Sequence, residues 1–281
     1  RTHLMDAMPL NMSQELSAWT DQLELTKESL LKVSDQLLLM PQGGTAVGTG
    51  INTHPRFSKE FAKEVSKLGK FKAIPSANFF RSLSAQDTSL RLSGEMRNLA
   101  TILMKISNDL RWMNSGPLSG LSEIELKALQ PGSSIMPGKV NPVIPEAVMM
   151  VSAEVIGNDS TITIAAQSGN FQLNVMLPVI AFKLLESINI LSGAMDILAK
   201  KAIRTFKVKH TNIQHSLNKN PILVTALNPV IGYSKAAEIA KRAYKEGKSI
   251  KEIALEMTNL SEKKLDYLLD PSRLTKGGIN R

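Results

Sequence analysis

The sequence predicts an all-α protein built as a helical bundle. Over long stretches of the 281 residues, apolar side chains recur at spacings of three and four with few helix breakers. That period places them on one face of an α-helix. No alternating apolar and polar runs bounded by turn dipeptides are found, so a parallel sheet is not expected. The bundle is therefore predicted from helices alone.

Four segments carry this pattern over helical lengths. The first helix is expected to start soon after Pro9 and to end before Pro41. The second is expected around residues 90–113, as its apolar face indicates, the third over about residues 146–162 and the fourth over residues 171–203. Pro178 falls inside the fourth, and a kink is expected there because proline removes a helical hydrogen bond. The apolar face of the second helix comprises Leu90, Met96, Leu99, Leu103, Ile106, Leu110 and Met113.

The pattern and the charge both change near residue 210, which predicts two domains, residues 1–210 and residues 211–281. The formal net charge is +9, and residues 200–281 carry 17 Lys and Arg against 7 Asp and Glu. Shorter helices are expected beyond this boundary. Ser249 with Glu252 has the form of a capping box, and Ser261 is expected to begin another short helix.

Composition excludes several kinds of protein. Without cysteine the chain has no disulfide, no thiolate metal site and no Cys nucleophile. No uninterrupted apolar run approaches the roughly 20 residues of a membrane helix. The lysines of the basic tail are scattered at helical spacing with few aromatics, which favours a solvated face over a nucleic-acid site. A soluble, cytoplasmic protein that binds neither membrane nor nucleic acid is expected.

The segment Gly132-Ser-Ser-Ile-Met-Pro-Gly-Lys-Val-Asn-Pro142 is the strongest functional signal. Two adjacent hydroxyls, Ser133 and Ser134, lie between glycines that can act as hinges, and Lys139 and Asn141 follow at a spacing that can present an ammonium and an amide to one carboxylate. These features predict a mobile catalytic loop. The alternative is a surface turn with a solvated lysine.

This segment resembles the signature of the fumarase/aspartase superfamily, and the likeness extends over essentially the whole chain. Pro137-Gly138-Lys139 and Ser168-Gly169-Asn170-Phe171 are similar to the class II fumarases, whereas Val143-Ile144-Pro145-Glu146 is closer to the aspartase style. Further similar blocks are Arg1–Leu10, Gln42–Gly50, Thr225–Asn228, Ile231–Tyr233 and Lys235–Ala240.

The resemblance implies an elongated antiparallel bundle of long helices with a small C-terminal helical domain, assembled as a homotetramer with shared active sites. It also implies a hydro-lyase that interconverts (S)-malate and fumarate by anti-elimination of water through an aci-carboxylate carbanion, without cofactor or metal. Two alternatives stay open. One is an aspartate ammonia-lyase, with the same carbanion chemistry and a different leaving group, and the other is a catalytically silent helical scaffold.

Roles for the loop residues follow from the same resemblance. Ser133 is assigned as the proton-abstracting residue and Ser134 is placed at the substrate. A serine can act as a base only where loop closure expels water and donors stabilise the alkoxide. Lys139 and Asn141 are assigned to a substrate carboxylate. The alternative for the serines is that both only form Ser-turn hydrogen bonds within the loop.

The resemblance also assigns Thr2 and His3 to substrate contact and proton transfer. Glu146, at the head of the following helix, could hold the imidazole of His3 in one tautomer. The alternative is that it only complements the helix dipole. The other three histidines, His54, His210 and His215, show no metal-ligand spacing.

One part of the superfamily pattern has no counterpart here. Superfamily members begin with an N-terminal domain and a first conserved segment rich in Ser, Thr, Asn and His, and nothing in this sequence resembles it. The chain is therefore expected to be a C-terminal fragment, with the N-terminal portion on a separate chain or absent.

Overall fold

The computed structural model describes residues 1–279, which form two units. One unit comprises residues 21–121 and 126–207, called here the bundle unit. The other comprises residues 1–20, 122–125 and, among the described residues, 208–279, called here the terminal unit. Helix α1 (Met12–Ser34) begins in the terminal unit and continues into the bundle unit. The sequence-based boundary near residue 210 stays a prediction.

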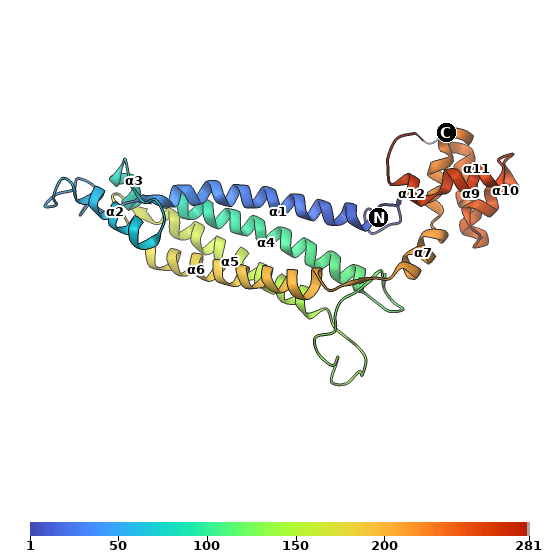
Figure 1. The fold of residues 1–281 in the computed structure, drawn as a ribbon, viewed down its shortest axis with the longest axis horizontal. Coiled ribbons are helices and arrows are strands. Elements are labelled where there is room, and N and C mark those ends of the chain that lie inside the picture. The colour runs from blue at the N-terminus through green and yellow to red at the C-terminus, as the bar shows by residue number, and fades with distance from the viewer. Residues whose placement is uncertain (280–281) are drawn as a thin grey trace. The chain divides into compact units, whose positions relative to one another are not determined.

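Three long helices lie wholly within the bundle unit, namely α4 (Asp87–Asn114), α5 (Val143–Gln167) and α6 (Leu177–Ile197). They run side by side, with α5 packing on both α4 and α6 (Figure 1). The predicted apolar face of α4 forms the core from Met96 to Met113. Residues of α5 and α6 complete it, among them Val148, Val155, Ile162, Ile180, Leu191 and Ala194. The all-α helical bundle is confirmed.

A polar tie joins α4 and α5 beside this core. Asp159 of α5 is almost fully buried and accepts a hydrogen bond from Ser93 at 2.6 Å and one from Arg97 at 2.8 Å, both on α4. A buried carboxylate is tolerable only when it is paired and hydrogen-bonded. The tie therefore fixes the register of α4 against α5.

Short elements close one end of the bundle unit. In chain order they are the 3₁₀ turn η1 (Asp35–Leu38), β1 (Leu39–Met40), α2 (Phe57–Gly69), β2 (Ile74–Pro75) and α3 (Phe79–Ser84). Strands β1 and β2 form a parallel pair of two residues each, which the sequence did not predict. The π-helical turn η2 (Leu198–Ile203) continues α6.

The predicted helix over residues 171–203 was wrong at its start. Residues 169–174 form a hairpin of β4 (Gly169–Asn170) and β5 (Leu173–Asn174), and α6 begins only at Leu177. Buried Asn174 explains the break, since its side chain donates to the carbonyl oxygen of Ala165 and accepts from the backbone of Met176. Pro178 therefore falls in the first turn of α6, where its missing N–H costs nothing, instead of kinking a helix interior.

The terminal unit is a cluster of short helices with its own core. They are α7 (His210–Lys219), the 3₁₀ segment η3 (Pro221–Leu227), α8 (Asn228–Ile231), α9 (Tyr233–Glu246), α10 (Ile250–Met257), α11 (Glu262–Leu269) and α12 (Pro271–Leu274). The strand β3 (Ile124–Glu125) pairs with β6 (Lys207–Val208) where the chain enters this unit. The core consists of Val224, Leu227, Ala236, Ile239, Ala243, Ile250, Ile253, Ala254, Leu265 and Leu268.

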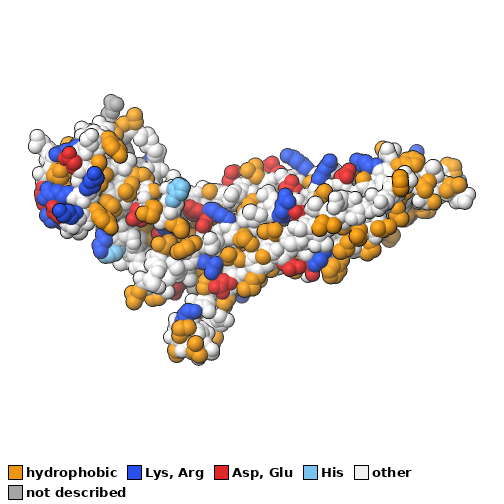
Figure 2. Space-filling view, turned by 180° about the vertical axis from the view of Figure 1, so that it is seen from behind, with side chains coloured by type: hydrophobic (Ala, Val, Ile, Leu, Met, Phe, Trp, Pro, Cys, Tyr) orange, Lys and Arg blue, Asp and Glu red, His pale blue; other side chains and the backbone are white. Residues whose placement is uncertain are grey.

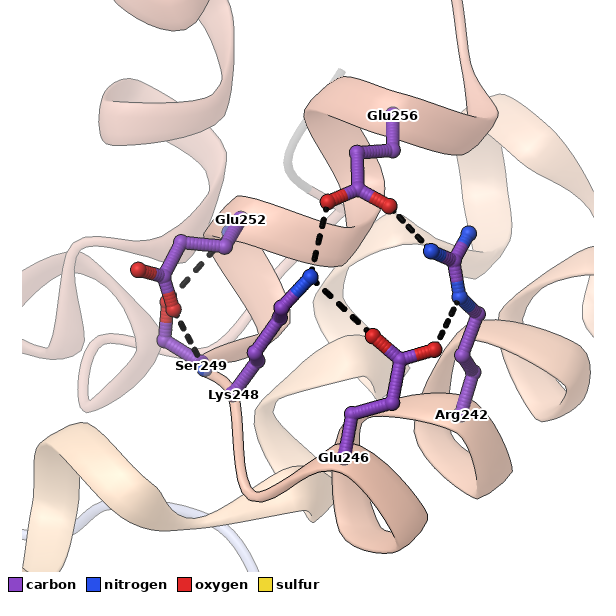
Figure 3. A network of polar contacts seen from close by, with 6 residues as sticks. All are labelled: Arg242, Glu246, Lys248, Ser249, Glu252 and Glu256. Carbon is purple, nitrogen blue, oxygen red and sulfur yellow. Dashed lines mark hydrogen bonds and ion pairs between the residues drawn. The ribbon is translucent and has the colours of Figure 1, made fainter.

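Both predicted caps are confirmed. Ser249 and Glu252 form a reciprocal capping box at the start of α10, and Ser261 caps α11. Close to the first of these, Arg242 and Glu246 of α9 join Lys248 and Glu256 in one network of alternating charges (Figure 3). The network connects the end of α9 to α10 across the Gly247 turn.

Large apolar side chains remain uncovered on the bundle unit. Figure 2 shows apolar side chains exposed along the surface of its helices. They include Met150, Ile164, Phe171, Leu173, Val175, Phe182, Leu185 and Ile188. The segment Leu177–Ile203 is long and apolar enough to cross a membrane by length and composition, and 22% of its most apolar stretch is buried. A core helix of a water-soluble protein meets the same criterion, and this one carries Lys183, Glu186 and Asp196.

Candidate active site

The loop over residues 132–142 folds back on itself ahead of α5, and it projects from the helices of the bundle unit (Figure 1). Gly132 and Pro137 form an isolated antiparallel bridge. The backbone N–H of Ser133 donates to the carbonyl oxygen of Lys139 at 3.0 Å, and that of Lys139 donates to Met136 at 3.1 Å. Ser133 and Lys139 are therefore held opposite each other at the neck of the loop.

Glycine is required at the neck for a steric reason. Gly132 has φ +105°, and a Cβ there would lie 2.9 Å from the carbonyl oxygen of Lys139. Gly138 also has a positive φ, +84°, yet a Cβ at that position would meet no atom within 4 Å. One glycine therefore permits the close approach of the two strands of the loop, and the other only permits its turn.

The polar side chains of the loop are available to a ligand. Ser133 is partly buried, whereas Ser134 and Lys139 are exposed. Within residues 1–279 their side chains have no hydrogen bond or ion pair to any other residue. The Ser-turn hydrogen bonds of the alternative interpretation are thus not formed in this conformation. The same loop also exposes the apolar residues Ile135, Met136 and Val140.

Asn141 and Glu146 lie where the loop runs into α5. The carbonyl oxygen of Asn141 accepts from Val143 at 2.9 Å, and that of Pro142 accepts from the backbone N–H of Glu146 at 3.2 Å. Glu146 therefore belongs to the first turn of α5, where a carboxylate is favoured by the unpaired N–H groups of the helix. Its Oε1 also lies 4.0 Å from Nε of Arg111 in α4, an ion pair that the sequence did not predict.

Thr2 and His3 lie in the terminal unit, in a tight turn. The backbones of Thr2 and Met5 exchange two hydrogen bonds, of 2.8 and 3.1 Å, and enclose His3 and Leu4. His3 has φ +53° and Leu4 has φ +59°, and both are exposed. A left-handed backbone at a non-glycine residue costs about 1–2 kcal/mol, and such strain clusters at functional sites.

Hydrogen bonds from two parts of the terminal unit fix the segment after this turn, residues 7–14. Asn220 donates from Nδ2 to the carbonyl oxygen of Ala7 at 2.7 Å. Gln14 donates from Nε2 to the carbonyl oxygen of Thr275 at 2.9 Å, and Asn11 donates from Nδ2 to the Thr275 hydroxyl at 3.2 Å. Arg1 forms an ion pair with Glu123. The turn that carries Thr2 and His3 is thus anchored at both ends.

The predicted site residues therefore form two groups. Ser133, Ser134, Lys139, Asn141 and Glu146 follow one another on the bundle unit, and Thr2 with His3 lies on the terminal unit. The first group offers hydroxyls, an ammonium and an amide, which suit a carboxylate whose charge increases during a reaction. Whether Glu146 supports the imidazole of His3 stays a prediction.

No metal site is formed among residues 1–279, and the two cavities described there, of about 440 and about 210 Å³, contain none of the predicted site residues. Among residues 1–279 no group of three His, Asp or Glu residues is placed to hold a metal ion. A cavity of about 440 Å³ lies against α4 and contains none of the predicted site residues. Its two arginines, Arg91 and Arg97, are already hydrogen-bonded to Gln36 and Asp159.

Comparison with known proteins identifies the class. A family model described as Lyase matches residues 1–157, more than half of the chain, so the chain belongs to this lyase family. A second model, described as Fumarase C C-terminus, matches residues 223–276.

The similar proteins point to one branch of that family. The chain is 57% identical over 279 residues to fumarate hydratase class II 2 of Pseudomonas aeruginosa and 45% identical over 276 residues to fumarate hydratase class II of Bacillus subtilis. It covers 61% and 60% of their lengths, so it spans about three fifths of these relatives. These matches cover 99% and 98% of the chain.

Solved structures agree with the sequence comparisons. The class II fumarase of Schistosoma mansoni superposes with a TM-score of 0.93 at 36% identity, over 98% of this chain and 60% of that one. A fumarate lyase:delta crystallin from Brucella melitensis gives a TM-score of 0.93 at 40% identity, with the same coverage of both chains. The resemblance to class II fumarases is confirmed.

Proposed function

We propose that this chain forms part of a hydro-lyase that interconverts (S)-malate and fumarate. The observation that carries the proposal is the loop of residues 132–142, whose hydroxyls, ammonium and amide are all free to meet a substrate. Its relatives named fumarate hydratase match 98–99% of the chain. Their names give the reaction of those proteins, and the loop supplies the groups that this reaction needs.

The proposed chemistry removes a proton and a hydroxyl from neighbouring carbons of malate. Ser133, ionised to its alkoxide, takes the proton from the carbon next to the carboxylate and becomes a hydroxyl, and the electron pair left behind is delocalised into that carboxylate as an aci-carboxylate dianion. The pair then forms the carbon–carbon double bond while the hydroxyl leaves the other carbon, protonated as water. Lys139 and Asn141 bind the carboxylate that gains charge, so their contribution is larger in the transition state than in the ground state.

The remaining roles are assigned to the other site residues. Ser134 and Thr2 contact substrate, and His3 transfers a proton with Glu146 as its partner. The strained turn of His3 supports a functional role for that residue. No cofactor or metal is assigned to the site.

The exposed apolar surface is proposed to bind further copies of the same chain. Contiguous apolar surface on a soluble protein marks an interface, and large apolar side chains such as Met150, Ile164, Phe182 and Ile188 are uncovered on the bundle unit. We propose a cytoplasmic homotetramer with active sites shared between chains. The domains are proposed to be residues 1–210 and residues 211–281.

An aspartate ammonia-lyase is the second candidate, because the segment Val143-Ile144-Pro145-Glu146 is closer to the aspartase style. An absorbance assay of fumarate formation decides between them, with (S)-malate and with L-aspartate as substrates for the native enzyme. Turnover of malate alone is expected. Turnover of aspartate alone would refute the proposed substrate, and turnover of neither would favour a silent scaffold.

A further inference from the structure

Arg111 of α4 lies beside the first turn of α5, immediately after the catalytic loop. Its Nη1 is 3.4 Å from Oδ1 of Asn108 and 3.4 Å from Sδ of Met149, and its Nε is 4.0 Å from Oε1 of Glu146. Glu146 and Met149 are three residues apart and so lie on one face of α5. The guanidinium therefore contacts the face of α5 that carries the Glu146 carboxylate.

The pair between Arg111 and Glu146 is loose. Nε of Arg111 is a buried atom without a hydrogen-bond partner among the described residues, and 4.0 Å is an ion-pair distance too long for a hydrogen bond. An unsatisfied buried donor is unfavourable. A modest movement of the Glu146 carboxylate toward Nε would satisfy it, so the donor favours one direction of that side chain.

A second pair between the same two helices shows what a purely structural tie looks like. Arg97 and Asp159 lie 2.8 Å apart, the Asp159 side chain is 5% exposed, and Ser93 provides a further hydrogen bond. Glu146, at 35% exposure, keeps access to solvent and to a ligand. An arginine–carboxylate pair between α4 and α5 is thus a fixed tie at Asp159 and an adjustable one beside the loop, at Glu146.

We propose that Arg111 is a positioning residue that orients the Glu146 carboxylate for its work in proton transfer. This inference rests on the proposed function, in which Glu146 supports His3. A planar guanidinium limits the directions that a carboxylate can adopt, and groups that orient a catalytic side chain commonly change the rate when removed. Arg111 does not touch substrate in this proposal and acts only through Glu146.

A double-mutant cycle on the native enzyme tests this. The variants are Arg111→Met, Glu146→Gln and the combination, and kcat and KM are measured for malate dehydration. Arg111→Met is expected to lower kcat by about tenfold or more, with KM changed by less than about threefold. In the Glu146→Gln background the same change is expected to cost less than about twofold, because its only route of action has been removed. Arg111→Lys should recover part of the lost kcat.

Arg97→Met is the matched control, because it breaks the other arginine–carboxylate tie between α4 and α5. It is expected to lower the melting temperature while kcat stays within about twofold of the parent. Losses that add in the double variant would overturn the inference, and so would an Arg111→Met enzyme with normal kcat. A normal Glu146→Gln enzyme would overturn it together with the role of Glu146, while leaving the hydro-lyase assignment intact. If the parent enzyme acts on aspartate instead of malate, the proposed substrate is wrong. The same double-mutant cycle, with the rate of ammonia release as its measurement, then still tests the role of Arg111.

Discussion

The backbone N–H of Ser133 donates a hydrogen bond to the carbonyl oxygen of Lys139, at 3.0 Å, across the neck of the loop. This one bond ties Ser133, the proposed base, to Lys139, which is proposed to bind the substrate carboxylate, although five residues separate them in sequence. The side chains of both remain free of partners within the described residues. The loop therefore fixes the backbone spacing of the two groups and leaves their reactive atoms for the substrate.

Replacing Ser133 by Ala is expected to abolish turnover of malate without changing the fold. The side chain contributes chemistry and is not part of the core, so the circular dichroism and the oligomer size should match the parent. Loss of a general base commonly costs roughly 100- to 10,000-fold in rate. Steady-state kinetics of the native enzyme provide the measurement. Ser134→Ala is the neighbouring control and should cost less, and activity of Ser133→Ala within about threefold of the parent would remove the base assignment.

Lys139→Met keeps most of the side-chain volume and removes the charge. Both substrate affinity and kcat are expected to fall, because the bound carboxylate gains negative charge at the transition state and loses its strongest fixed donor. The measurement is kcat/KM over a range of ionic strengths. An unchanged kcat/KM would show that the lysine is only a solvated loop residue.

Much of the fold could be predicted from the sequence because the long helices bury one regular face. The apolar spacing from Leu90 to Met113 predicted α4, and Ser249 with Glu252 predicted the cap of α10. The start of α6 was missed because it depends on Asn174, whose two-sided hydrogen bonding ends α5 and begins α6. Apolar residues on both sides of that break continue the helical period and conceal it.

For the site, the sequence predicted the residue types but not their surroundings. The loop from Gly132 to Pro142 carries its chemistry in consecutive residues, so it could be recognised without a structure. The contact between Arg111 and Glu146 joins residues 35 positions apart in sequence on two helices, and no local pattern encodes it. The left-handed backbone of His3 and Leu4 was equally hidden, since leucine does not favour this conformation and histidine, although enriched in it, adopts it only in a minority of cases.

Gly132→Ala is expected to lower kcat strongly, because the added Cβ would lie 2.9 Å from a backbone oxygen that cannot move without breaking the bond between Ser133 and Lys139. Gly138→Ala is the matched control, with a positive φ but open space around the Cβ. Each carries a backbone cost of about 1–2 kcal/mol, so only the difference between the two reports on the neck of the loop. Measured kcat should fall at least about tenfold further for Gly132→Ala than for Gly138→Ala. Equal losses would show that backbone strain alone matters.

Glu246→Gln is expected to weaken the terminal unit at neutral pH and to have little effect in acid. A hydrogen bond from Arg242 at 2.6 Å, assisted by Lys248 at 3.1 Å, holds the pKa of Glu246 below its ordinary value of 4.5. A carboxyl group whose pKa is lowered by folding stabilises the folded state above its unfolded pKa, and that contribution disappears as the pH falls through the lower folded value. The melting temperature of the variant should therefore lie below that of the parent at about pH 7 and converge with it at about pH 3. Glu238→Gln, which breaks only a 3.6 Å pair with Lys235 on the same helix, is the control and should give a smaller difference at neutral pH. A gap between parent and Glu246→Gln that stays constant with pH would show that the loss comes from packing of the side chain and not from its charge.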